Sequence, residues 1–161
     1  MIAEIFNTTL LIRLVASFFC SAAFAIVFKA AKRHLVAAGL SGIVTWFVYH
    51  LFAVISGSVF IAAFCSTLAG AVFAEVYARI GRTPVTVILF ASMIPIVPGG
   101  DLYYTMQHAI AGAGDEAIEY FIRTMSIALG IAGGIVVTAL AFRIMFDKIA
   151  EYKKRKSSEN Q

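Results

Sequence analysis

Long apolar runs, separated by short clusters of basic residues, constrain this chain more than any other feature. A membrane-spanning helix needs about 20 apolar residues, and runs of roughly that length or more cover residues 9–28, 35–55, 59–76 and 117–146. A further, interrupted run begins at Pro84. The chain is 61% apolar and 14% charged, whereas soluble domains are about 45–50% apolar and about 25% charged. A soluble enzyme, a disordered chain and a nucleic-acid binder are therefore poor fits. We predict an all-α, polytopic membrane helix bundle with about five transmembrane helices.

The placement of the basic residues predicts which ends of the helices face the cytoplasm. They gather at residues 29–33 and 79–82 and in the C-terminal stretch 148–156. Lys and Arg mark cytoplasmic loops, and five crossings put all three clusters on one side if the N-terminus is outside and the C-terminus inside. We therefore expect a single transmembrane domain over residues 1–146, followed by a basic cytoplasmic tail over residues 147–161.

A cleaved signal peptide is the alternative for the first apolar run. The small residues Ser21–Ala25 resemble a cleavage site after an apolar stretch. The leader, however, contains Glu4 and a single basic residue, Arg13. Cleavage would also leave the basic cluster at 29–33 on the outer face. We therefore favour a spanning helix over a signal peptide.

Small residues recur where membrane helices are expected to touch. Gly130 and Gly134 form a GxxxG pair in the last apolar run, with Gly133 beside them. Inside lipid, helices associate through close approach of their backbones, which small residues permit. Other small residues of this kind lie in the second and third runs: Gly39, Gly42, Ser66 and Gly70. We expect helix packing, and not substrate contact, at these positions.

The fourth segment is predicted to be a broken membrane helix. From Pro84 to Val97 it spans 14 residues, which is about 21 Å of helix against a hydrocarbon core of about 30 Å. Pro98-Gly99-Gly100 cannot continue a regular helix, because proline lacks an N–H and glycine costs ordering entropy. We predict one half at 84–96, a non-helical break at 97–100 and a second half at 101–112. Such breaks are tolerated only against protein or a water-filled cavity, and transporters build binding sites from them.

Asp101, directly after this break, admits three interpretations. As the N-cap of the second half-helix, it would accept hydrogen bonds from the first backbone amides. As a carboxylate at membrane depth, it would bind a substrate ammonium group or carry a proton. It could also lie in a shallow, solvated position. The residue alone does not choose among the three.

A polar face follows Asp101 along the second half-helix. Asp101, Tyr104, Thr105 and His108 recur at i, i+3, i+4 and i+7, so they share one side of a helix. A polar stripe on an otherwise apolar segment is expected to face a cavity, and a face in plain water at the outer surface is the alternative. The candidate substrate-binding residues are Pro98, Gly99, Gly100, Asp101, Tyr104, Thr105 and His108.

Polar residues outside the fourth segment suit structural roles. Glu75 precedes Arg79 by four residues, which predicts an ion pair along one helix. Arg13 and Arg123 are expected to extend to the outer membrane surface. Three residues lie on the outer half of the second run: Trp46, Tyr49 and His50. We expect them to form part of an interfacial aromatic belt. For His50, a pore-facing proton site is the alternative.

No catalytic signature occurs in the sequence. There is no supported Ser/His/Asp set, no glycine-rich phosphate loop and no metal-ligand spacing. Cys20 and Cys65 lie within apolar runs, so they are expected to pack as small residues. We expect neither an enzyme nor a bound cofactor.

With these residues in view, the chain resembles the threonine/serine exporter family in its short, single-domain form. The resemblance spans about residues 10 to 145 and rests on the order and spacing of several pieces. These are Ala25–Phe28, Ala38–Gly42 followed by Trp46 and Tyr49, Glu75–Arg79, Pro84, Ile94–Gly100, Tyr103–Met106, and Gly130 with Gly133 and Gly134.

The resemblance implies transport. Full-length relatives join a larger N-terminal membrane domain to one of this kind and export threonine and serine, and split relatives encode the two parts as separate proteins. It therefore implies the small subunit of a two-component exporter in a bacterial plasma (inner) membrane. The implied partners are a larger exporter-type membrane subunit, a small-molecule substrate and the lipid bilayer. Homo-oligomerisation stays open, and no nucleic acid is expected.

Two other functions stay open at this point. A related split pair is associated with dicarboxylate (succinate-type) export, and a non-transporting membrane scaffold is the second alternative. A zwitterion needs an anionic contact as well as a cationic one. Asp101 offers the anionic contact and disfavours a dianion, and a scaffold would not need the polar face at 101–108.

Overall fold

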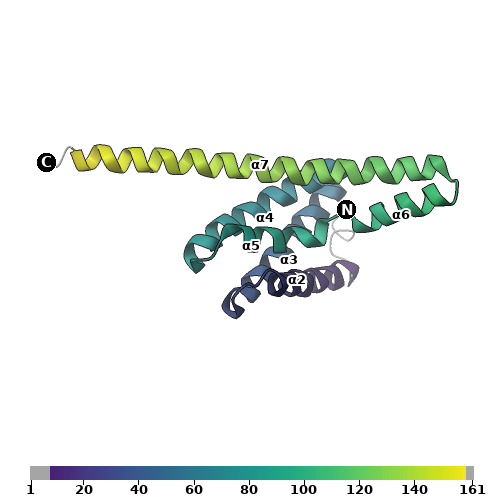
Figure 1. Cartoon of the computed structure of the whole chain (residues 1–161), viewed down its shortest axis with the longest axis horizontal. Coiled ribbons are helices and arrows are strands. Elements are labelled where there is room, and N and C mark those ends of the chain that lie inside the picture. The colour runs from purple at the N-terminus through teal and green to yellow at the C-terminus, as the bar shows by residue number, and fades with distance from the viewer. Residues whose placement is uncertain (1–7, 159–161) are drawn as a thin grey trace.

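The computed structural model describes residues 8–158, and the side chains of residues 9–148. Between these limits every regular element is a helix, as predicted (Figure 1). The elements are α2 (Thr8–Val27), the short 3₁₀ helix η1 (Lys32–His34), α3 (Leu35–Ser56), α4 (Val59–Gly81), α5 (Val85–Met93), the 3₁₀ helix η2 (Ile94–Ile96), α6 (Gly99–Ile110) and α7 (Gly114–Ser158).

The described helices confirm a polytopic membrane bundle. Four stretches, in α2, η1–α3, α4 and α7, are long and apolar enough to cross a membrane. A fifth candidate is the pair Val85–Ile96 and Gly99–Ile110, which meets the same test only when joined and is bent by 49°. The predicted broken fourth helix is therefore confirmed as a bent pair.

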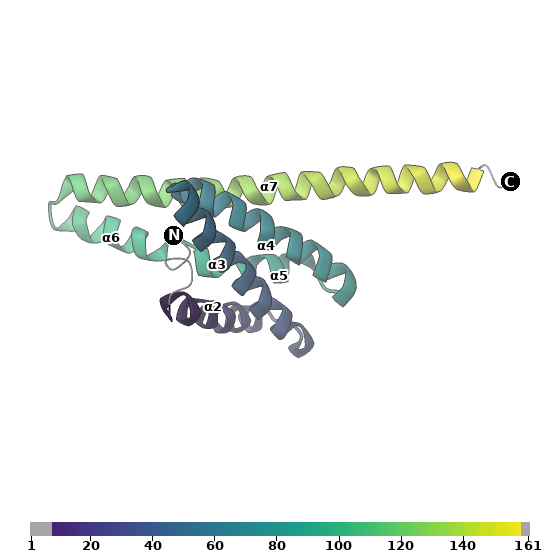
Figure 2. The same ribbon diagram turned by 180° about the vertical axis from the view of Figure 1, so that it is seen from behind.

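Helix α4 lies at the centre of the bundle, where it contacts α3, α5 and α7. Helix α2 packs against α3, and α6 packs mainly against α7. Figures 1 and 2 show α6 running antiparallel along the first part of α7, and this hairpin projects beyond the neighbouring ends of α2, α3 and α4. The C-terminal part of α7 projects beyond the opposite end of the bundle.

The basic clusters gather at one end of the bundle. The turn that holds η1, the turn between α4 and α5, and the C-terminal end of α7 all lie toward the left in Figure 1. The start of α2, the turn between α3 and α4, and the tip of the α6–α7 hairpin lie toward the right. The helices therefore separate the basic turns from the other turns, as the pattern of charges predicts.

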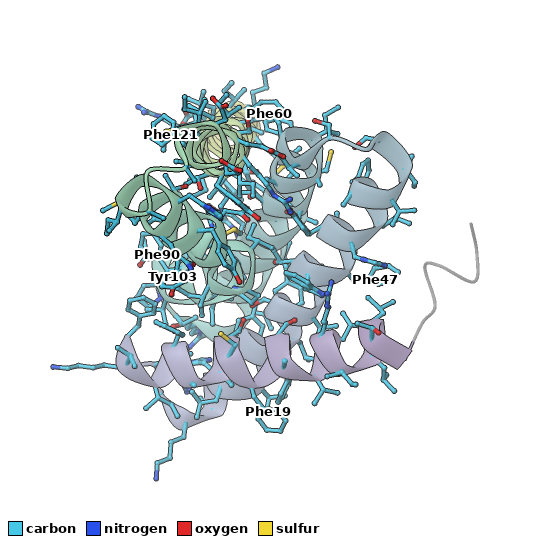
Figure 3. All side chains as sticks on the ribbon, turned by 90° about the vertical axis from the view of Figure 1, so that its right-hand side faces the viewer. Phe19, Phe47, Phe60, Phe90, Tyr103 and Phe121 are labelled. Atoms are coloured by element: carbon cyan, nitrogen blue, oxygen red, sulfur yellow. The ribbon has the colours of Figure 1, made fainter. Side chains whose placement is uncertain are left out.

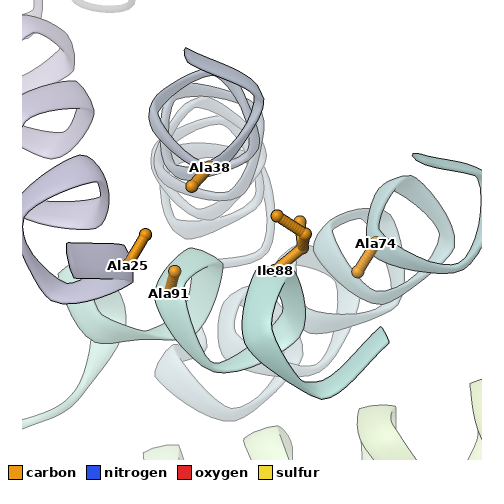
Figure 4. Close-up of a cluster of buried hydrophobic side chains, with 5 residues drawn as sticks. All are labelled: Ala25, Ala38, Ala74, Ile88 and Ala91. Atoms are coloured by element: carbon orange, nitrogen blue, oxygen red, sulfur yellow. The ribbon is translucent and has the colours of Figure 1, made fainter. Parts of the chain in front are cut away.

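Small side chains form the core where α2, α3, α4 and α5 meet. Figure 4 shows the cluster, which consists of four alanines around one larger residue, Ile88, and all five are fully buried. The alanines are Ala25, Ala38, Ala74 and Ala91. Alanine lets backbones approach closely, and close backbone approach is what holds helices together in lipid.

Three buried hydroxyl groups of α3 and α4 bond within their own helices. In α3, the Ser41 hydroxyl donates to the Ala38 carbonyl over 2.7 Å, and the Thr45 hydroxyl donates to Ser41 over 2.9 Å. In α4, the Ser66 hydroxyl donates to the Ala63 carbonyl over 2.9 Å. A hydroxyl that is satisfied by the preceding turn adds little polarity to an interface, so these residues serve as small packing residues.

The GxxxG pair lies at a tight contact between α7 and α4. A Cβ atom added to Gly130 would lie 2.8 Å from the Phe60 carbonyl oxygen. One added to Gly134 would lie 2.7 Å from the Cβ of Thr67. This confirms that the two glycines are packing residues, and it identifies α4 as the helix they face.

Large apolar side chains cover the outside of the bundle. Phe19 on α2 and Phe121 on α7 are 65% and 49% exposed, and Figure 3 shows Phe19 directed away from the other helices. In water such a surface would be costly, but in a bilayer these side chains face hydrocarbon. The exposed apolar surface is therefore the one expected of a membrane domain.

Two helices extend further than the apolar runs that predict them. Helix α4 continues to Gly81, and α7 continues without a break from the apolar run into the basic segment, as far as Ser158. With 45 residues, α7 is about 68 Å long, more than twice the hydrocarbon thickness. An apolar run ends where charged residues begin, but charged residues do not by themselves end a helix, whereas Gly and Pro disfavour one. Residues 147–158 contain neither Gly nor Pro, so α7 continues through them.

The predicted ion pair in α4 is confirmed, and it also joins α4 to α7. The Arg79 Nη2 atom lies 3.0 Å from the Glu75 Oε2 atom. The same guanidinium lies over the ring of Phe146, at 3.5 Å from its centroid. This contact between a cation and an aromatic face holds the basic end of α4 against α7.

Candidate functional site

The break between α5 and α6 is shorter than the sequence predicts. Only Val97 and Pro98 lie between η2 and α6, because α6 already begins at Gly99. The Gly99 amide donates to the Val97 carbonyl over 2.8 Å, across a Pro98 with φ −77° and ψ 51°. These angles are those of an inverse γ-turn. The prediction of a non-helical break over 97–100 is therefore corrected: Gly99 and Gly100 form the first turn of α6.

The break lies against a cavity of about 380 Å³. Ligand pockets in proteins measure about 300–1,000 Å³, so this volume suits a small molecule. Six helical elements, α2, α3, α4, η2, α6 and α7, supply its walls together with the break itself. The lining residues are Arg13, Trp46, Tyr49, His50, Ala53, Val59, Pro95, Ile96, Val97, Pro98, Gly100, Asp101, Arg123 and Ile127.

Asp101 forms an ion pair with Arg123 at this cavity. The Arg123 Nε atom lies 3.0 Å from the Asp101 Oδ2 atom. The Asp101 side chain is 19% exposed and the Arg123 side chain 53%. The pair joins the start of α6 to α7, across the hairpin that turns at Ala111–Ala113. Arg123, expected at the membrane surface, therefore pairs with the carboxylate of the break.

The N-cap interpretation of Asp101 is wrong. The N-cap of α6 is Pro98, which places Asp101 at the third residue of the helix. The first helical hydrogen bond here runs from the Leu102 amide to the Pro98 carbonyl, over 3.0 Å. A proline N-cap has no side-chain oxygen that could bind the first amides. The Asp101 carboxylate is directed toward Arg123 and not toward those amides.

The positive end of α6 points into the same region. Within the described residues, the Gly100 and Asp101 amides donate no backbone hydrogen bond. Such first-turn amides carry partial positive charge and favour anions. The cavity therefore offers backbone amides as well as charged side chains to a ligand.

Trp46 and His50 contribute buried polar atoms that lack partners. The Trp46 Nε1 and His50 Nε2 atoms are buried, and neither makes a hydrogen bond within the described residues. Tyr49 stacks on Trp46, with ring centroids 5.6 Å apart. A buried polar atom without a partner costs about 1–3 kcal/mol. A ligand or water in the cavity would remove that cost. These three residues line the cavity, and their place in an interfacial aromatic belt stays a prediction.

The rest of the polar face on α6 lies away from this cavity. The ring of His108 stacks on Tyr120 of α7, with centroids 5.4 Å apart, and Tyr104 contacts the same ring at 5.3 Å. The Thr105 hydroxyl donates to the Asp101 carbonyl over 2.8 Å. Of the seven candidate residues, the structure brings Pro98, Gly100 and Asp101 to the cavity. Gly99, Tyr104, Thr105 and His108 do not line it.

Arg13 lines the cavity from α2. It also lines a neighbouring cavity of about 230 Å³, together with Ser17, Cys20, Trp46 and other residues. The sequence contained one signal for Arg13 and Arg123, namely that each interrupts an apolar run. Ionisable residues inside membrane segments are costly and mark functional sites, so both could have been assigned to the site.

The lining residues suit binding of a small charged molecule. Two guanidinium groups and one carboxylate lie around a space bounded by the break and by Trp46. Among the described residues, no group of three or more His, Cys, Asp or Glu side chains could hold a metal ion. A polar cavity beside a broken helix, inside a bundle with a lipid-facing surface, defines a helical membrane protein of the transporter type.

The comparison with protein families agrees with this class. Residues 13–141 match the family described as "Threonine/Serine exporter, ThrE", so the chain belongs to the threonine/serine exporter family. The match begins within α2 and ends within α7, so it includes the break, Asp101 and Arg123. No curated protein and no solved structure matches the chain closely enough to count as similar.

Proposed function

We propose that this chain is the smaller membrane subunit of an exporter for threonine and serine, and that it acts with a separate, larger membrane subunit. The main observation in support of this proposal is the cavity at the α5–α6 break, where the Asp101 carboxylate and the Arg123 guanidinium lie 3.0 Å apart. A zwitterionic amino acid has an ammonium group and a carboxylate, and the cavity offers one charged partner to each. The family match supports the transport class and favours a carrier over an enzyme.

The size of the described bundle supports the proposed partner. The described part of the chain offers at most five spans, counting the bent pair as one. An alternating-access carrier moves one bundle or repeat against another around the binding site. A second membrane subunit supplies the opposing wall in this proposal, and a homodimer of this chain is the alternative.

Export of a dicarboxylate is a second candidate function. The observation in its favour is that two guanidinium groups, Arg13 and Arg123, line the cavity. Asp101 opposes it, because a carboxylate in the cavity repels a dianion. We therefore place threonine and serine first.

Efflux from cells tests the proposal. Cells that carry this chain and the larger subunit are loaded with threonine, serine or succinate and transferred to medium without them. We expect threonine and serine efflux to depend on both subunits, with succinate unaffected. Efflux of succinate alone would assign the dicarboxylate function, and equal efflux with and without this chain would contradict both.

The proposal includes an orientation in a bacterial plasma membrane, with the N-terminus outside and the C-terminus in the cytoplasm. The separation of the basic turns from the others in the bundle supports it, because basic turns face the cytoplasm.

Cysteine labelling tests this orientation. In a background with Cys20 and Cys65 replaced by alanine, single cysteines are introduced as Ser56→Cys and Ser157→Cys. Ser56 lies exposed at the end of α3. We expect a membrane-impermeant maleimide to label Ser56→Cys and to spare Ser157→Cys until the membrane is permeabilised. Equal labelling from outside at both positions would rule out the orientation.

A further inference from the structure

The ion pair at the cavity differs from the other ion pair of the described structure. In α4, the Arg79 guanidinium both pairs with Glu75 and donates a directed hydrogen bond to it over 3.0 Å. Arg123 and Asp101 lie at the same separation, yet no hydrogen bond of acceptable geometry joins their side chains in the described structure. A guanidinium carries five N–H donors, and its strongest pairs with carboxylates are bidentate. Arg123 therefore keeps donors that a better-aligned carboxylate can take.

The surroundings of Arg123 favour an incoming carboxylate. The Arg123 side chain is 53% exposed, more than its partner Asp101 at 19%, and Arg123 lines the cavity. Arg13 lines the same cavity, and the Gly100 amide at the start of α6 adds partial positive charge. The Nε1 atom of Trp46, buried and without a hydrogen-bond partner among the described residues, is a further donor.

We propose that Arg123 is the carboxylate receptor of the cavity, and that the ligand's carboxylate displaces Asp101 from it. Asp101, once released, accepts the ligand's ammonium group. The exchange conserves charge, since one ion pair is replaced by two and the ligand is a zwitterion. The ligand class is thus an α-amino acid small enough for about 380 Å³. This inference rests on the proposed function, and it assigns the site's two charged contacts.

The exchange also couples binding to the shape of the broken helix. The pair between Asp101 and Arg123 ties the first turn of α6 to α7, next to a break of two residues. A zwitterion replaces this direct tie with one contact to each of its two charged groups. A ligand with one charged group leaves either Asp101 or Arg123 without a charged partner, so it competes less well with the ion pair.

Trp46 gives a direct measurement of binding, because it is the only tryptophan in the chain and it lines the cavity. The full chain, purified in lipid nanodiscs, is titrated with three ligands of nearly equal size. L-Threonine carries both charged groups, β-hydroxybutyrate only the carboxylate, and L-threoninol only the ammonium. We expect threonine to bind most tightly and threoninol most weakly. The affinity for β-hydroxybutyrate is expected to be lower than that for threonine by a factor of about ten or more, because the loss of a charged contact costs at least that factor.

Variants of Arg123 separate recognition from folding. Arg123→Gln is expected to weaken threonine binding by about thirtyfold, and Arg123→Lys by less, because lysine keeps the charge and loses the fork of donors. Arg143→Gln is the matched control, since it removes one exposed guanidinium from the same helix and does not touch the cavity. Trp46→Phe verifies the source of the signal. Equilibrium dialysis with labelled threonine detects binding that leaves the fluorescence unchanged.

The outcomes distinguish this inference from the proposed function. Threonine binding by Arg123→Gln within twofold of the unaltered chain, equal binding of threonine and threoninol, or no threonine binding by either method would overturn the receptor role. Absent threonine efflux from cells, together with threonine binding that depends on Arg123, would overturn the export function and leave the receptor standing.

Discussion

Replacing Asp101 by Asn is expected to reduce threonine efflux by about thirtyfold or more while the protein still folds and reaches the membrane. Asn keeps the size and polarity of the side chain and removes its charge. If Asp101 holds the substrate ammonium, the lost contact is worth about 2 kcal/mol or more, which corresponds to that factor. Efflux of labelled threonine is measured in cells that contain both subunits, at matched amounts of protein in the membrane.

A purely structural ion pair would predict a different result for the double variant. Asp101→Asn alone leaves the Arg123 charge without its carboxylate, which by itself destabilises the contact between α6 and α7. Asp101→Asn combined with Arg123→Gln removes both charges and leaves two groups that can hydrogen-bond. We expect the double variant to regain thermal stability and to stay inactive. Recovery of efflux in the double variant would show that the pair is only structural.

The second large effect is expected at the contact between α4 and α7. A methyl group at Gly134 would lie 2.7 Å from the Thr67 Cβ atom and 3.0 Å from the Phe64 carbonyl oxygen. Backbone cannot move aside as a side chain can, so Gly134→Ala is expected to cost about 1–3 kcal/mol, the usual range for overpacking. Gly134→Leu is expected to cost more and to lower the yield of folded protein.

The neighbouring glycine is a matched control for this effect. A methyl group at Gly133 would lie 3.4 Å from the ring of Phe64, which is an ordinary contact with a movable side chain. Gly133→Ala also gains helix propensity, by about 1 kcal/mol. Thermal unfolding of the purified variants in detergent should therefore place Gly133→Ala at or above the unaltered chain and Gly134→Ala clearly below it. Equal unfolding temperatures for the two variants would contradict the close contact with α4.

The helical plan follows from local features of the chain. Apolar runs predict α2 and α3 to within about a residue at each end, because a membrane span is set by hydropathy along the chain. Pro98 predicts the break, because proline lacks the N–H that a helical hydrogen bond needs. This effect is local and does not depend on how the helix packs. The predicted break over 97–100 is too long because glycine is permissive in a helix and does not end one without other causes. Helix α7 continues into polar residues as far as Ser158. Hydropathy does not predict this extension, because the added residues are not apolar.

The composition of the candidate site depends on contacts between helices. Asp101 could be singled out as a carboxylate at a break, but its partner lies on another helix, 22 residues along the chain. Pairing with Arg123 requires the antiparallel register of α6 on α7, and the packing of a whole hairpin sets that register. The rotation of α3 about its axis likewise decides whether Trp46 and His50 face lipid or a cavity. Periodicity shows that residues share a face, and only the packed neighbours show which face is inside. For this reason Tyr104 and His108, which share a face with Asp101 in sequence, contact the ring of Tyr120, while Arg13 and Arg123 from other helices complete the lining of the cavity.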